Sequence, residues 1–600
     1  MRLFLRRLPA LGGLQLFALI CAAVIGIASA NAATLIVTTA ADSGAGSLRQ
    51  ALADAHNGDT IQFDAALNGQ TINLTSGELV IDKNITISGP GSNLLTVSRA
   101  STAANFRIFH VTPNHTVIIG GLTISGGLVD GTSNGGGILN SGSLTIANST
   151  ISGNQAGLVS TSQIGYGGGI SNSGMLEISS SFINSNSANF SGGGISNTGT
   201  VTITDGTIRD NAAGFKFSPG SGLGGGISNQ DHGTVTVRNS RVSANRTTGH
   251  TSGFGGGGIG SDSSNTTQEI INSTISGNFS FVEGGGVLNG GSLTITNSTF
   301  GDNSSSSLAG AWGIHNNGGM LQIGNTILKG GQGANIINSN SGTVISHGYN
   351  LSSDNGGGFL NATGDQINTD PMLGPLQNNG GPTFTHELLV GSPAINAGDP
   401  NFTPPPFTDQ RGPGYARVFN GRIDIGSFEV QPTPPPITIS GTISYCSNPV
   451  PGPVPNVVLT LTGSASGTML SDGAGNYIFS SLASGGTYTV TPSKAAVTPG
   501  GTGANINTID VVATQRHFLL IALLSGCRLT AADVNGDNAV NTVDVVAIQR
   551  FYLGATTGTA NVGQYKFTPV SRTYPALINN QTGQNYDALV LGDVVAPFVE

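Results

Sequence analysis

A glycine-rich string, GGGISN in its commonest form, returns seven times between residues 134 and 316, and this repetition restricts the chain to few folds. Each copy is followed by short alternating strand patterns, separated by Gly, Asn and Ser, which turn a chain at low cost. The aliphatic residue after the glycines recurs at spacings of 32, 25, 32, 32, 28 and 27 residues, the period of a solenoid coil. These anchors are Ile138, Ile170, Ile195, Ile227, Ile259, Val287 and Ile314.

Three strand-like runs in each repeat predict a parallel β-helix with three strands and three corners per coil, as at 137–140, 144–146 and 149–151. Stacked coils pair at about 4.8 Å, so several coils are needed to bury the aliphatic face. Six repeats carry an asparagine after the third run. Stacked asparagines can hydrogen-bond from coil to coil, so we interpret this ladder as structural. Its members are Asn154, Asn186, Asn211, Asn245, Asn278 and Asn303.

The N-terminus has the pattern of a secretory signal peptide. Three arginines precede an apolar stretch at 16–27 and the small residues Ala28-Ser29-Ala30, so we expect residues 1–32 to be removed and the chain exported. An uncleaved anchor is the alternative, although the apolar stretch is short for a span. The mature chain would carry 19 basic and 31 acidic residues. We therefore expect no nucleic-acid partner and no membrane span after cleavage.

Changes of composition divide the rest of the chain, with caps expected at both ends of the solenoid because open ends expose strand edges. We expect an N-terminal cap and first coils (33–110), repeats (111–330), C-terminal coils and cap (331–431), a Pro-rich linker (432–436), a small β-sandwich (437–500), a loop-helix pair (501–555) and a β-rich tail (556–600). The tail either completes the sandwich or starts a second one, because 565–569 echoes 488–492.

Four short motifs mark the two ends of the solenoid: GSLRQAL at 46–52, SPAINAGD at 392–399, TDQRG at 408–412 and DIGSFE at 424–429. They resemble motifs of secreted bacterial right-handed parallel β-helix proteins of the pectin-lyase-like fold, over about two thirds of the chain. This resemblance implies a secreted or cell-surface β-helix, sometimes adhesin-like, and does not fix a chemistry. The sandwich is similar to carboxypeptidase-regulatory-like or Cna-B-like modules, which act as spacers and display domains.

A duplicated segment, 504–519 and 538–553, carries the metal signal. Before the second copy, oxygen-bearing groups fall at positions 1, 3, 5, 7, 9 and 12 of a loop, the spacing by which twelve residues surround calcium. In the first copy, positions 1, 3 and 5 are Pro499, Gly501 and Gly503, so we predict one Ca²⁺. The predicted ligands are Asp533, Asn535, Asp537, the Ala539 carbonyl, Asn541 and Asp544.

The pair resembles a dockerin, the calcium-bound loop-helix pair that docks into cohesin modules of extracellular polysaccharide-degrading assemblies. A calcium-stabilised element that docks to nothing is the alternative. Cys446 and Cys527 remain after processing and can pair in an oxidising compartment, with two free thiols as the other possibility. The resemblance places partner contacts at Thr508, Ile509, Gln515, Arg516, Thr542, Val543, Gln549 and Arg550.

Catalysis on the solenoid has few candidate groups. Glu177 and Glu269 share an outward column but lie three coils, about 14 Å, apart, too far for glycosidic cleavage by two carboxylates. Asp205 falls in a column of asparagines, so it is also interpreted as a ladder member. The remaining candidates for a lyase-like site are Asp205, Asp210, Arg238 and Arg241.

Taken together, the patterns predict an all-β chain: a right-handed parallel β-helix, a small β-sandwich and a dockerin-like calcium loop-helix pair. We expect an exported, non-catalytic protein that binds an extracellular glycan or cell surface and docks to a cohesin-like module. A dockerin-tethered polysaccharide lyase or glycoside hydrolase is the main alternative, and a surface-layer spacer is a third.

Overall fold

The computed structural model divides the chain into two compact units, Met1–Gln431 and Pro432–Glu600, which are described separately. It describes residues 32–130, 133–157, 164–214, 222–248, 255–306, 311–331, 333–432, 436–446, 452–500 and 506–595. Almost all of the expected signal peptide and most of the expected linker lie outside these ranges. In the described residues, no helix is both long and apolar enough to cross a membrane.

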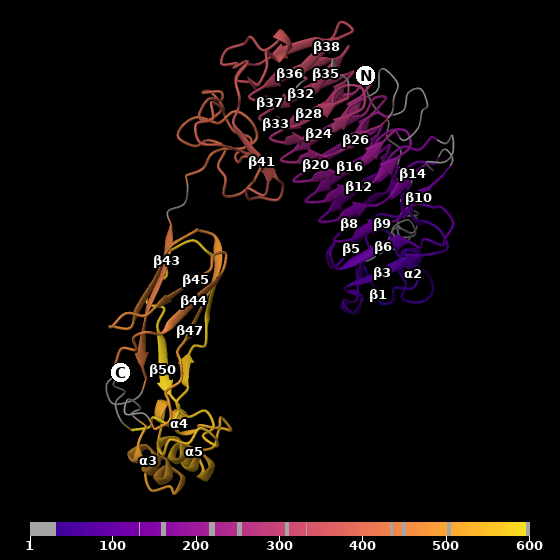
Figure 1. The fold of residues 1–600 in the computed structure, drawn as a ribbon. Helices are drawn as coiled ribbons and strands as arrows, with labels where there is room; N and C mark the ends of the chain where they lie inside the picture. Colours follow the sequence, from indigo (N-terminus) through magenta and orange to yellow (C-terminus); the bar gives the residue numbers. More distant parts are fainter. Residues whose placement is uncertain are drawn as a thin grey trace, which may run out of the picture. The chain divides into compact units, whose positions relative to one another are not determined.

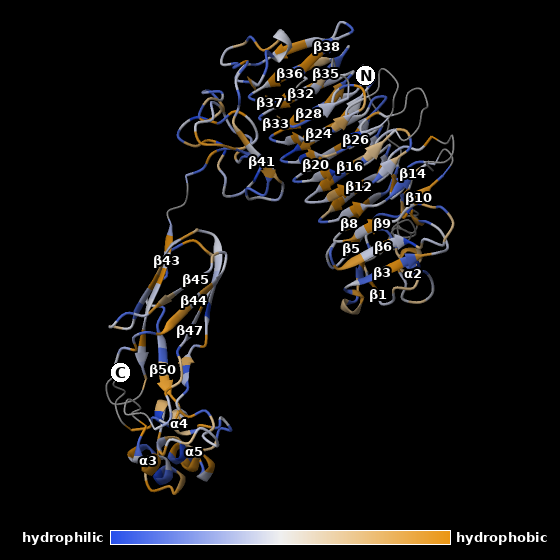
Figure 2. Ribbon diagram, viewed as in Figure 1, coloured by the Kyte–Doolittle hydropathy of each residue, from blue (hydrophilic) through white to orange (hydrophobic). Residues whose placement is uncertain are grey.

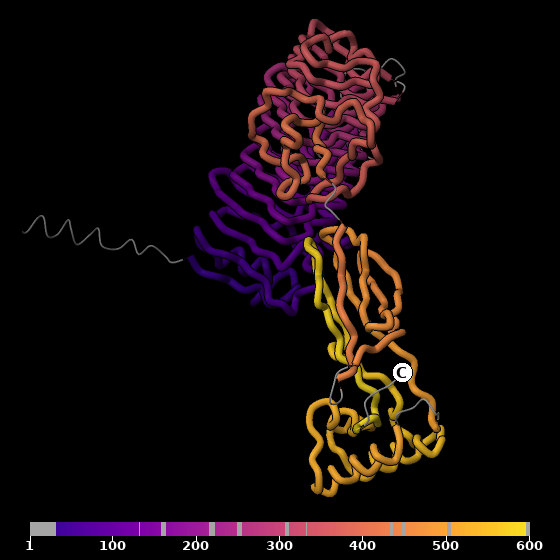
Figure 3. Tube along the Cα trace, turned by 90° about the vertical axis from the view of Figure 1, so that its left-hand side faces the viewer, coloured from indigo at the N-terminus to yellow at the C-terminus, as the bar shows by residue number. Residues whose placement is uncertain are grey.

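The first unit is a parallel β-helix, whose coils follow one another as stacked rungs (Figures 1 and 3). Sheet A contains β1 (Thr34–Val37), β2 (Thr60–Phe63), β5 (Ile85–Ser88), β8 (Thr116–Gly120), β12 (Ser143–Ala147), β16 (Met175–Ser179), β20 (Thr200–Thr204), β24 (Thr234–Arg238), β28 (Thr267–Ile271), β32 (Ser292–Thr296), β36 (Met320–Gly324) and β39 (Thr343–Ser346). Sheet B contains β3 (Gln70–Leu74), β6 (Leu95–Arg99), β9 (Thr123–Ser125), β13 (Thr150–Ser152), β17 (Phe182–Asn184), β21 (Thr207–Arg209), β25 (Arg241–Ser243), β29 (Thr274–Ser276), β33 (Thr299–Gly301), β37 (Ile327–Lys329) and β40 (Leu351–Ser352).

Two further sheets close the coils. Sheet C contains β4 (Leu79–Ile81), β7 (Phe109–Val111), β11 (Ile138–Asn140), β15 (Ile170–Asn172), β19 (Ile195–Asn197), β23 (Ile227–Asn229), β27 (Ile259–Ser261), β31 (Val287–Asn289), β35 (Ala311–Asn317) and β38 (Ala334–Ser339). Sheet D contains β10 (Leu128–Val129), β14 (Gln155–Ala156), β18 (Ser187–Ala188), β22 (Ala212–Ala213), β26 (Arg246–Thr247), β30 (Phe279–Ser280) and β34 (Ser304–Ser305).

The short strands of sheet D correct the expectation of three strands per coil. A central coil runs through sheets C, A, B and D in turn, as β11, β12, β13 and β14 do. The fourth strand has only two residues, too few to show an alternating pattern, so its signal is absent from the sequence. The asparagines after the third strand therefore lie at the corner between sheets B and D.

The core is formed by equivalent residues stacked in register. Ile138 pairs with Ile170, and that residue pairs with Ile195, so each column repeats one shape from coil to coil. All of these side chains are fully buried, and the buried aliphatics form one cluster from Val37 to Leu360. Figure 2 shows hydrophobic residues, in orange, along many strands of the solenoid, with hydrophilic residues between them. A coil thus completes its core only through its neighbours.

The asparagine ladder is confirmed as structural. Each Nδ2 donates to the Oδ1 of the next coil, and that same Oδ1 also accepts the backbone N–H of the previous asparagine. All six side chains are buried. The Nδ2–Oδ1 distances from Asn154 to Asn303 are 3.0, 3.0, 2.9, 2.9 and 2.9 Å.

A second asparagine ladder, which the sequence analysis did not identify, runs along sheet C. Its side chains bond from Asn140 to Asn172, Asn197 and Asn229, and again from Asn289 to Asn316 and Asn338. Ser261 interrupts the column. There, Gln268 takes the position of a core leucine on sheet A and donates to Asn289 Oδ1 at 3.3 Å. A longer polar side chain from a neighbouring column thus bonds to the ladder at the break.

Both ends of the solenoid are covered. At the first end, α2 (Leu48–Asp54), capped by Ser47, buries three apolar side chains. At the other end, Phe359 and Leu360, next to the turn η2 (Gly356–Gly358), pack on the core. Residues 371–431, here called the side flap, instead lie along sheet B, where Thr274 donates to Gln410 at 2.6 Å and Ser427 bonds to Thr299. The flap includes the hairpin β41 (Leu373–Gln377) and β42 (Thr385–Leu388).

The second unit is a β-sandwich with a helical insertion. One sheet contains β43 (Ile437–Tyr445), β46 (Asn476–Leu482), β48 (Tyr565–Thr568) and β50 (Tyr586–Val590), and the other contains β44 (Val458–Gly463), β45 (Gly467–Leu470), β47 (Gly486–Ser493) and β49 (Arg572–Leu577). The tail strands β48, β49 and β50 therefore complete this sandwich. The helices α3 (Thr508–Phe518), α4 (Cys527–Ala532) and α5 (Thr542–Tyr552) are inserted between β47 and β48.

The helices and the sandwich share one hydrophobic core. Ile548 and Phe551 of α5 belong to the same buried cluster as Tyr445 and Val590 of the sandwich. A disulfide joins Cys446, after β43, to Cys527 at the start of α4, with the Cα atoms 6.1 Å apart. The pairing expected for an oxidising compartment is therefore present, and the alternative of two free thiols is not.

Candidate functional site

The candidates for a lyase-like site lie at two corners of one coil and on the next coil. Asp205 has φ +54 and occupies the same left-handed corner position as Asn148 and Asn239. Burial raises the pKa of Asp205, and a hydrogen bond from Asn239 opposes that rise. Its environment is that of a ladder member. Asp210, at the next corner, forms an ion pair with Arg209 at 2.5 Å.

The two arginines have separate partners. Arg238 forms a 2.7 Å ion pair with Glu269, and both side chains are largely exposed. Arg241 donates to Ser243 at 2.6 Å, and its guanidinium lies 4.9 Å from the ring centre of Phe384 in the side flap. The Asp205 backbone N–H donates to the Arg238 carbonyl at 3.2 Å, as part of the coil-to-coil pairing. Among the described residues, no side-chain hydrogen bond or ion pair joins any two of Asp205, Asp210, Arg238 and Arg241.

A groove of about 580 Å³ lies on the outer face of sheet C, away from those candidates. Its floor is formed by small outward residues such as Ser171 and Ser196, because the neighbouring positions of each strand point into the core. Tyr166 and Phe190 contribute an aromatic pair whose ring centres lie 5.0 Å apart at 60°. Further lining residues are Asn134, Leu139, Asn172, Ser173, Thr198, Gln230, Asp231, Asp262 and Ser263.

Two carboxylates from adjacent coils complete this groove. Asp231 follows β23 with φ +55, and Asp262 follows β27. The Asp262 carboxyl reaches solvent, but its partial burial in the groove raises its pKa. The negative charge of Asp231 raises the pKa of Asp262 further. Burial, followed by the charges of Asp262 and Asp231, also raises the pKa of Tyr166. The groove therefore combines apolar ring faces with negative charge and amide and hydroxyl groups.

Such a lining suits a sugar. Aromatic faces stack on the C–H faces of pyranose rings, while carboxylates, amides and hydroxyls bond to their hydroxyl groups. This groove was not predicted from the sequence, because its residues come from several coils and lie near one another only after stacking. The available signal was an aromatic residue one or two positions before two successive glycine triplets, at Tyr166 and Phe190.

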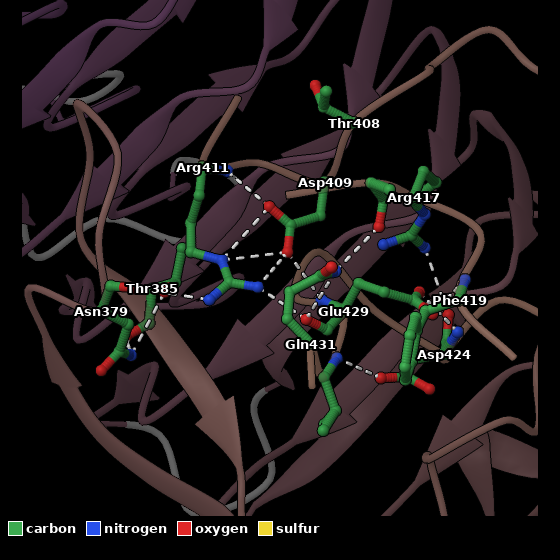
Figure 4. Close-up of polar contacts among 12 residues, drawn as sticks. Asn379, Thr385, Thr408, Asp409, Arg411, Arg417, Phe419, Asp424, Glu429 and Gln431 are labelled. Carbon is green, nitrogen blue, oxygen red and sulfur yellow. Dashed lines mark hydrogen bonds and ion pairs between the residues drawn. The ribbon is translucent and has the colours of Figure 1, made fainter. Parts of the chain in front are cut away.

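A network of buried charges holds the side flap together (Figure 4). Arg411 pairs with Asp409 at 2.6 Å, donates to the Glu429 carbonyl at 2.6 Å, and lies 3.8 Å from the ring centres of both Tyr415 and Phe428. Asp409 and Arg411 belong to the TDQRG motif, and Phe428 and Glu429 belong to the DIGSFE motif. The residues that carry the sequence resemblance therefore build the flap.

The second half of the network surrounds a fully buried arginine. Arg417 donates to the carbonyls of Gly426 at 2.6 Å and Asp424 at 3.2 Å. The Glu429 carboxyl accepts the backbone N–H groups of Asp424 and Phe419. Burial, and then the nearby Asp424, raise the pKa of Glu429 to about 8. Each of these charged side chains has at least one backbone partner inside the flap, although Nε and Nη1 of Arg417 have no hydrogen-bond partner among the described residues. We therefore interpret the network as structural.

The six predicted calcium ligands lie in one loop that ends at α5. Asp533 accepts backbone N–H groups of Gly536, Asp537 and Asn538. Asn538 has φ +65, as the sixth position of such a loop requires. In the described residues, no three acidic, histidine or cysteine side chains already surround a common point. The donors are all oxygens at the spacing that calcium prefers, so the loop fits this ion chemically, with the carboxylates turned towards the backbone.

Asp544 closes the loop from its twelfth position. Its buried carboxylate accepts N–H groups from Val534 and Asn535 at 3.0 and 3.3 Å, and from Asn541 at 3.0 Å. The last bond belongs to a capping box that starts α5. One carboxylate therefore fixes both ends of the loop and the first turn of the helix.

The first copy is closed in the same way by a distant segment. Asp510 accepts N–H groups from Val594 and Val595 at 2.8 and 2.9 Å, and from Asn507 at 2.9 Å. In the first copy, the stretch that begins at Asp593 thus replaces the start of the loop. In the second copy, the equivalent stretch begins at Asp533. Residues 501–505, which the sequence analysis aligned with the missing loop, lie outside the described residues. The sequence could not show the substitution, because the replacing segment follows Asp510 by more than 80 residues.

Comparison with known protein-family models and with curated proteins finds no match for this chain.

Calcium should stabilise the second unit. Saturation to about 100 times the Kd would add about 2.7 kcal/mol to its free energy of unfolding, because an ion that binds the folded loop and not the unfolded chain favours the folded state. Asp533→Ala should abolish this gain, whereas Asp587→Ala, the same change at an exposed position of β50, should retain it. Thermal unfolding with millimolar calcium or a chelator measures the difference. A wild-type unfolding curve that is the same with calcium and with the chelator would contradict the assignment of this loop as a calcium site.

Glu429 should make the first unit more stable at pH 5.5 than at pH 8.5. At pH values between the pKa of a glutamate in the unfolded chain and about 8, Glu429 is protonated in the folded state and ionised in the unfolded state. The free energy of unfolding therefore falls as the pH rises through this range. Glu429→Gln should reduce this fall by on the order of 3 kcal/mol. The control is Glu387→Gln on β42 of the same flap, and the measurement is urea unfolding at both pH values. An equal fall in Glu429→Gln would show that another group causes it.

Proposed function

We propose that this chain is an exported β-helix protein that binds an extracellular glycan in the sheet C groove and docks to a partner module through its helical pair. The observation that carries the proposal is the Tyr166–Phe190 pair, which lies in one groove with Asp231 and Asp262. Export rests on the signal-peptide pattern of the N-terminus. The groove is assigned to binding rather than cleavage of the glycan.

The charge of the groove narrows the glycan class. Two carboxylates on adjacent coils repel uronic acids and sulfated sugars, because like charges at short range raise the free energy of the complex. The same carboxylates accept hydrogen bonds from neutral sugar hydroxyls and attract amino sugars. Neutral or amino-sugar polymers are therefore the preferred ligands, and the solenoid presents the groove on a rigid surface.

Docking is supported by a duplicated apolar surface. Ile509 of α3 and Val543 of α5, equivalent at the offset of 34, are 58% and 56% exposed, and Val512 and Val546 are both 49% exposed. The eight residues that the dockerin resemblance assigns to partner contacts are all exposed. Exposed aliphatic side chains on two packed helices are typical of an interaction surface. A module that docks to nothing would leave this surface unexplained.

Cleavage is the second candidate function, and one observation favours it. The raised pKa of Asp262 beside Asp231 resembles the division of roles between a protonated acid and an ionised partner in glycosidases. In that case the chain would be a glycoside hydrolase tethered by its helical module, and Asp262 would donate the proton to the leaving group.

Loss of the aromatic pair should weaken glycan binding. Tyr166→Ala and Phe190→Ala should each reduce the affinity for the preferred polysaccharide about fivefold, since each removes a stacking surface worth about 1 kcal/mol. Phe182→Ala, an exposed aromatic of sheet B, is the matched control. Pull-down on a panel of insoluble plant and bacterial glycans measures retention. Retention on none of them, or unchanged retention in both variants, would refute the groove assignment.

Measuring new reducing ends in the same incubations distinguishes binding of the glycan from its cleavage. If the wild-type chain releases them and Asp262→Asn does not, the hydrolase replaces the binding protein as the function of this groove.

The helical surface should bind cohesin-like modules in a calcium-dependent way. Val543→Asp should weaken binding more than Ile509→Asp, because the second copy carries the complete loop. A charge placed in an apolar contact should cost at least tenfold in affinity. Val570→Asp, at an exposed position outside the helices, is the control. Surface plasmon resonance against a panel of such modules provides the measurement, and equal binding by the double variant would exclude this surface.

A further inference from the structure

We propose that Ser339, His315 and Glu283 form a second, catalytic site: a serine hydrolase centre that cleaves esters of short acyl groups. The three residues come from three successive coils at the C-terminal part of sheet C. Neither the sequence patterns nor the glycan groove involves them, so the proposal is independent of the function proposed above.

The register of sheet C brings the serine and histidine together. His315 lies between Ile314 and Asn316, which point into the core, so its ring is on the outer face of β35. Ser339 ends β38 on the same face, and its backbone pairs with Asn317, two residues beyond His315. The Ser339 Oγ therefore lies 2.8 Å from His315 Nε2, the distance of a nucleophile from its general base.

The acid is on the other side of the ring. Glu283 precedes the glycines that lead into β31, and its Oε2 lies 2.6 Å from His315 Nδ1. The contact is off the line of the ring N–H, so it is an ion-pair distance rather than an aligned hydrogen bond. The Glu283 side chain is 39% exposed, and such bonds commonly align only when substrate is bound. A proton on Nδ1 faces the carboxylate, which leaves Nε2 to accept from Ser339.

The surroundings favour a neutral, basic imidazole. His315 is 4% exposed and stacks in register between Leu288 and Ile337, so burial lowers its pKa, while Glu283 opposes that fall. Glu283 is the charged group that faces the ring among the described residues. Ser339 is half-buried and reachable from solvent, and Ile337 beside it offers an apolar contact for a short acyl chain.

The reaction balances without a cofactor. Ser339 Oγ attacks the ester carbonyl carbon while His315 Nε2 takes the hydroxyl proton. The carbon–alkoxy bond then breaks, and His315 returns the proton to the leaving alcohol. Water, deprotonated by His315, hydrolyses the acyl-serine, which releases the carboxylic acid and restores the hydroxyl. In the free chain the Ser339 hydroxyl also lies 3.3 Å from Asn317 Oδ1, which can accept its proton, so attack requires the hydroxyl to turn towards His315 Nε2.

The test uses the full chain with p-nitrophenyl acetate as substrate and a fluorophosphonate as covalent probe. We expect the probe on Ser339, located by peptide mass spectrometry, and a fall in turnover of at least 100-fold in Ser339→Ala and His315→Gln and about tenfold in Glu283→Gln. The rate should rise with pH through a pKa below the usual value for histidine, because burial lowers that of His315.

Ser341→Gly is the matched control, because it removes a nearby exposed hydroxyl at a position with φ +61, where glycine is unstrained. It should keep full turnover. If a variant unfolds, the residue that the probe labels in the folded wild-type chain still tests whether Ser339 is the nucleophile. A wild-type chain that takes no label and does not hydrolyse the ester, a label on another residue, or undiminished turnover in Ser339→Ala would each overturn the proposal.

Discussion

Parallel pairing of each coil with the next, in one register, is the constraint on which the first unit depends. Because the register is kept over many coils, identical side chains stack in columns, and an asparagine column can satisfy its own buried polar groups. A single asparagine buried in this interior would cost free energy. In the ladder, each Oδ1 accepts both a side-chain and a backbone N–H of the neighbouring coil, so the polar corner stabilises the stack.

The same register creates the candidate sites. Tyr166 and Phe190 lie on successive coils, as do Asp231 and Asp262, and the contacts between Glu283, His315 and Ser339 cross three coils. In each case the spacing in sequence is one turn of the solenoid, and the spacing in space is one strand separation. Outward positions of sheet C therefore differ from coil to coil and can carry chemical groups, while the inward columns are mostly aliphatic residues and asparagines, with Ser261 as an interruption.

The second unit depends instead on contacts between its N-terminal and C-terminal parts. The tail supplies strands to both sheets of the sandwich, and its last described residues bond to Asp510 as the loop start bonds to Asp544. The helical pair is thus built into the sandwich by a shared core, a disulfide and this return of the chain. A docking surface on such a module is held rigidly, which reduces the entropy lost on binding.

The sequence alone determined the class of fold, the identity of the core columns and the first asparagine ladder, because a solenoid repeats its local pattern in every coil. It also identified the twelve-residue loop before α5, whose oxygen positions depend only on local spacing. Only the tertiary structure revealed the two-residue strands of sheet D, the flap along sheet B and the groove with its two carboxylates. Those features depend on contacts between residues up to 153 positions apart, as Thr274 and Ser427 are, and a local pattern carries no information about which distant residues meet.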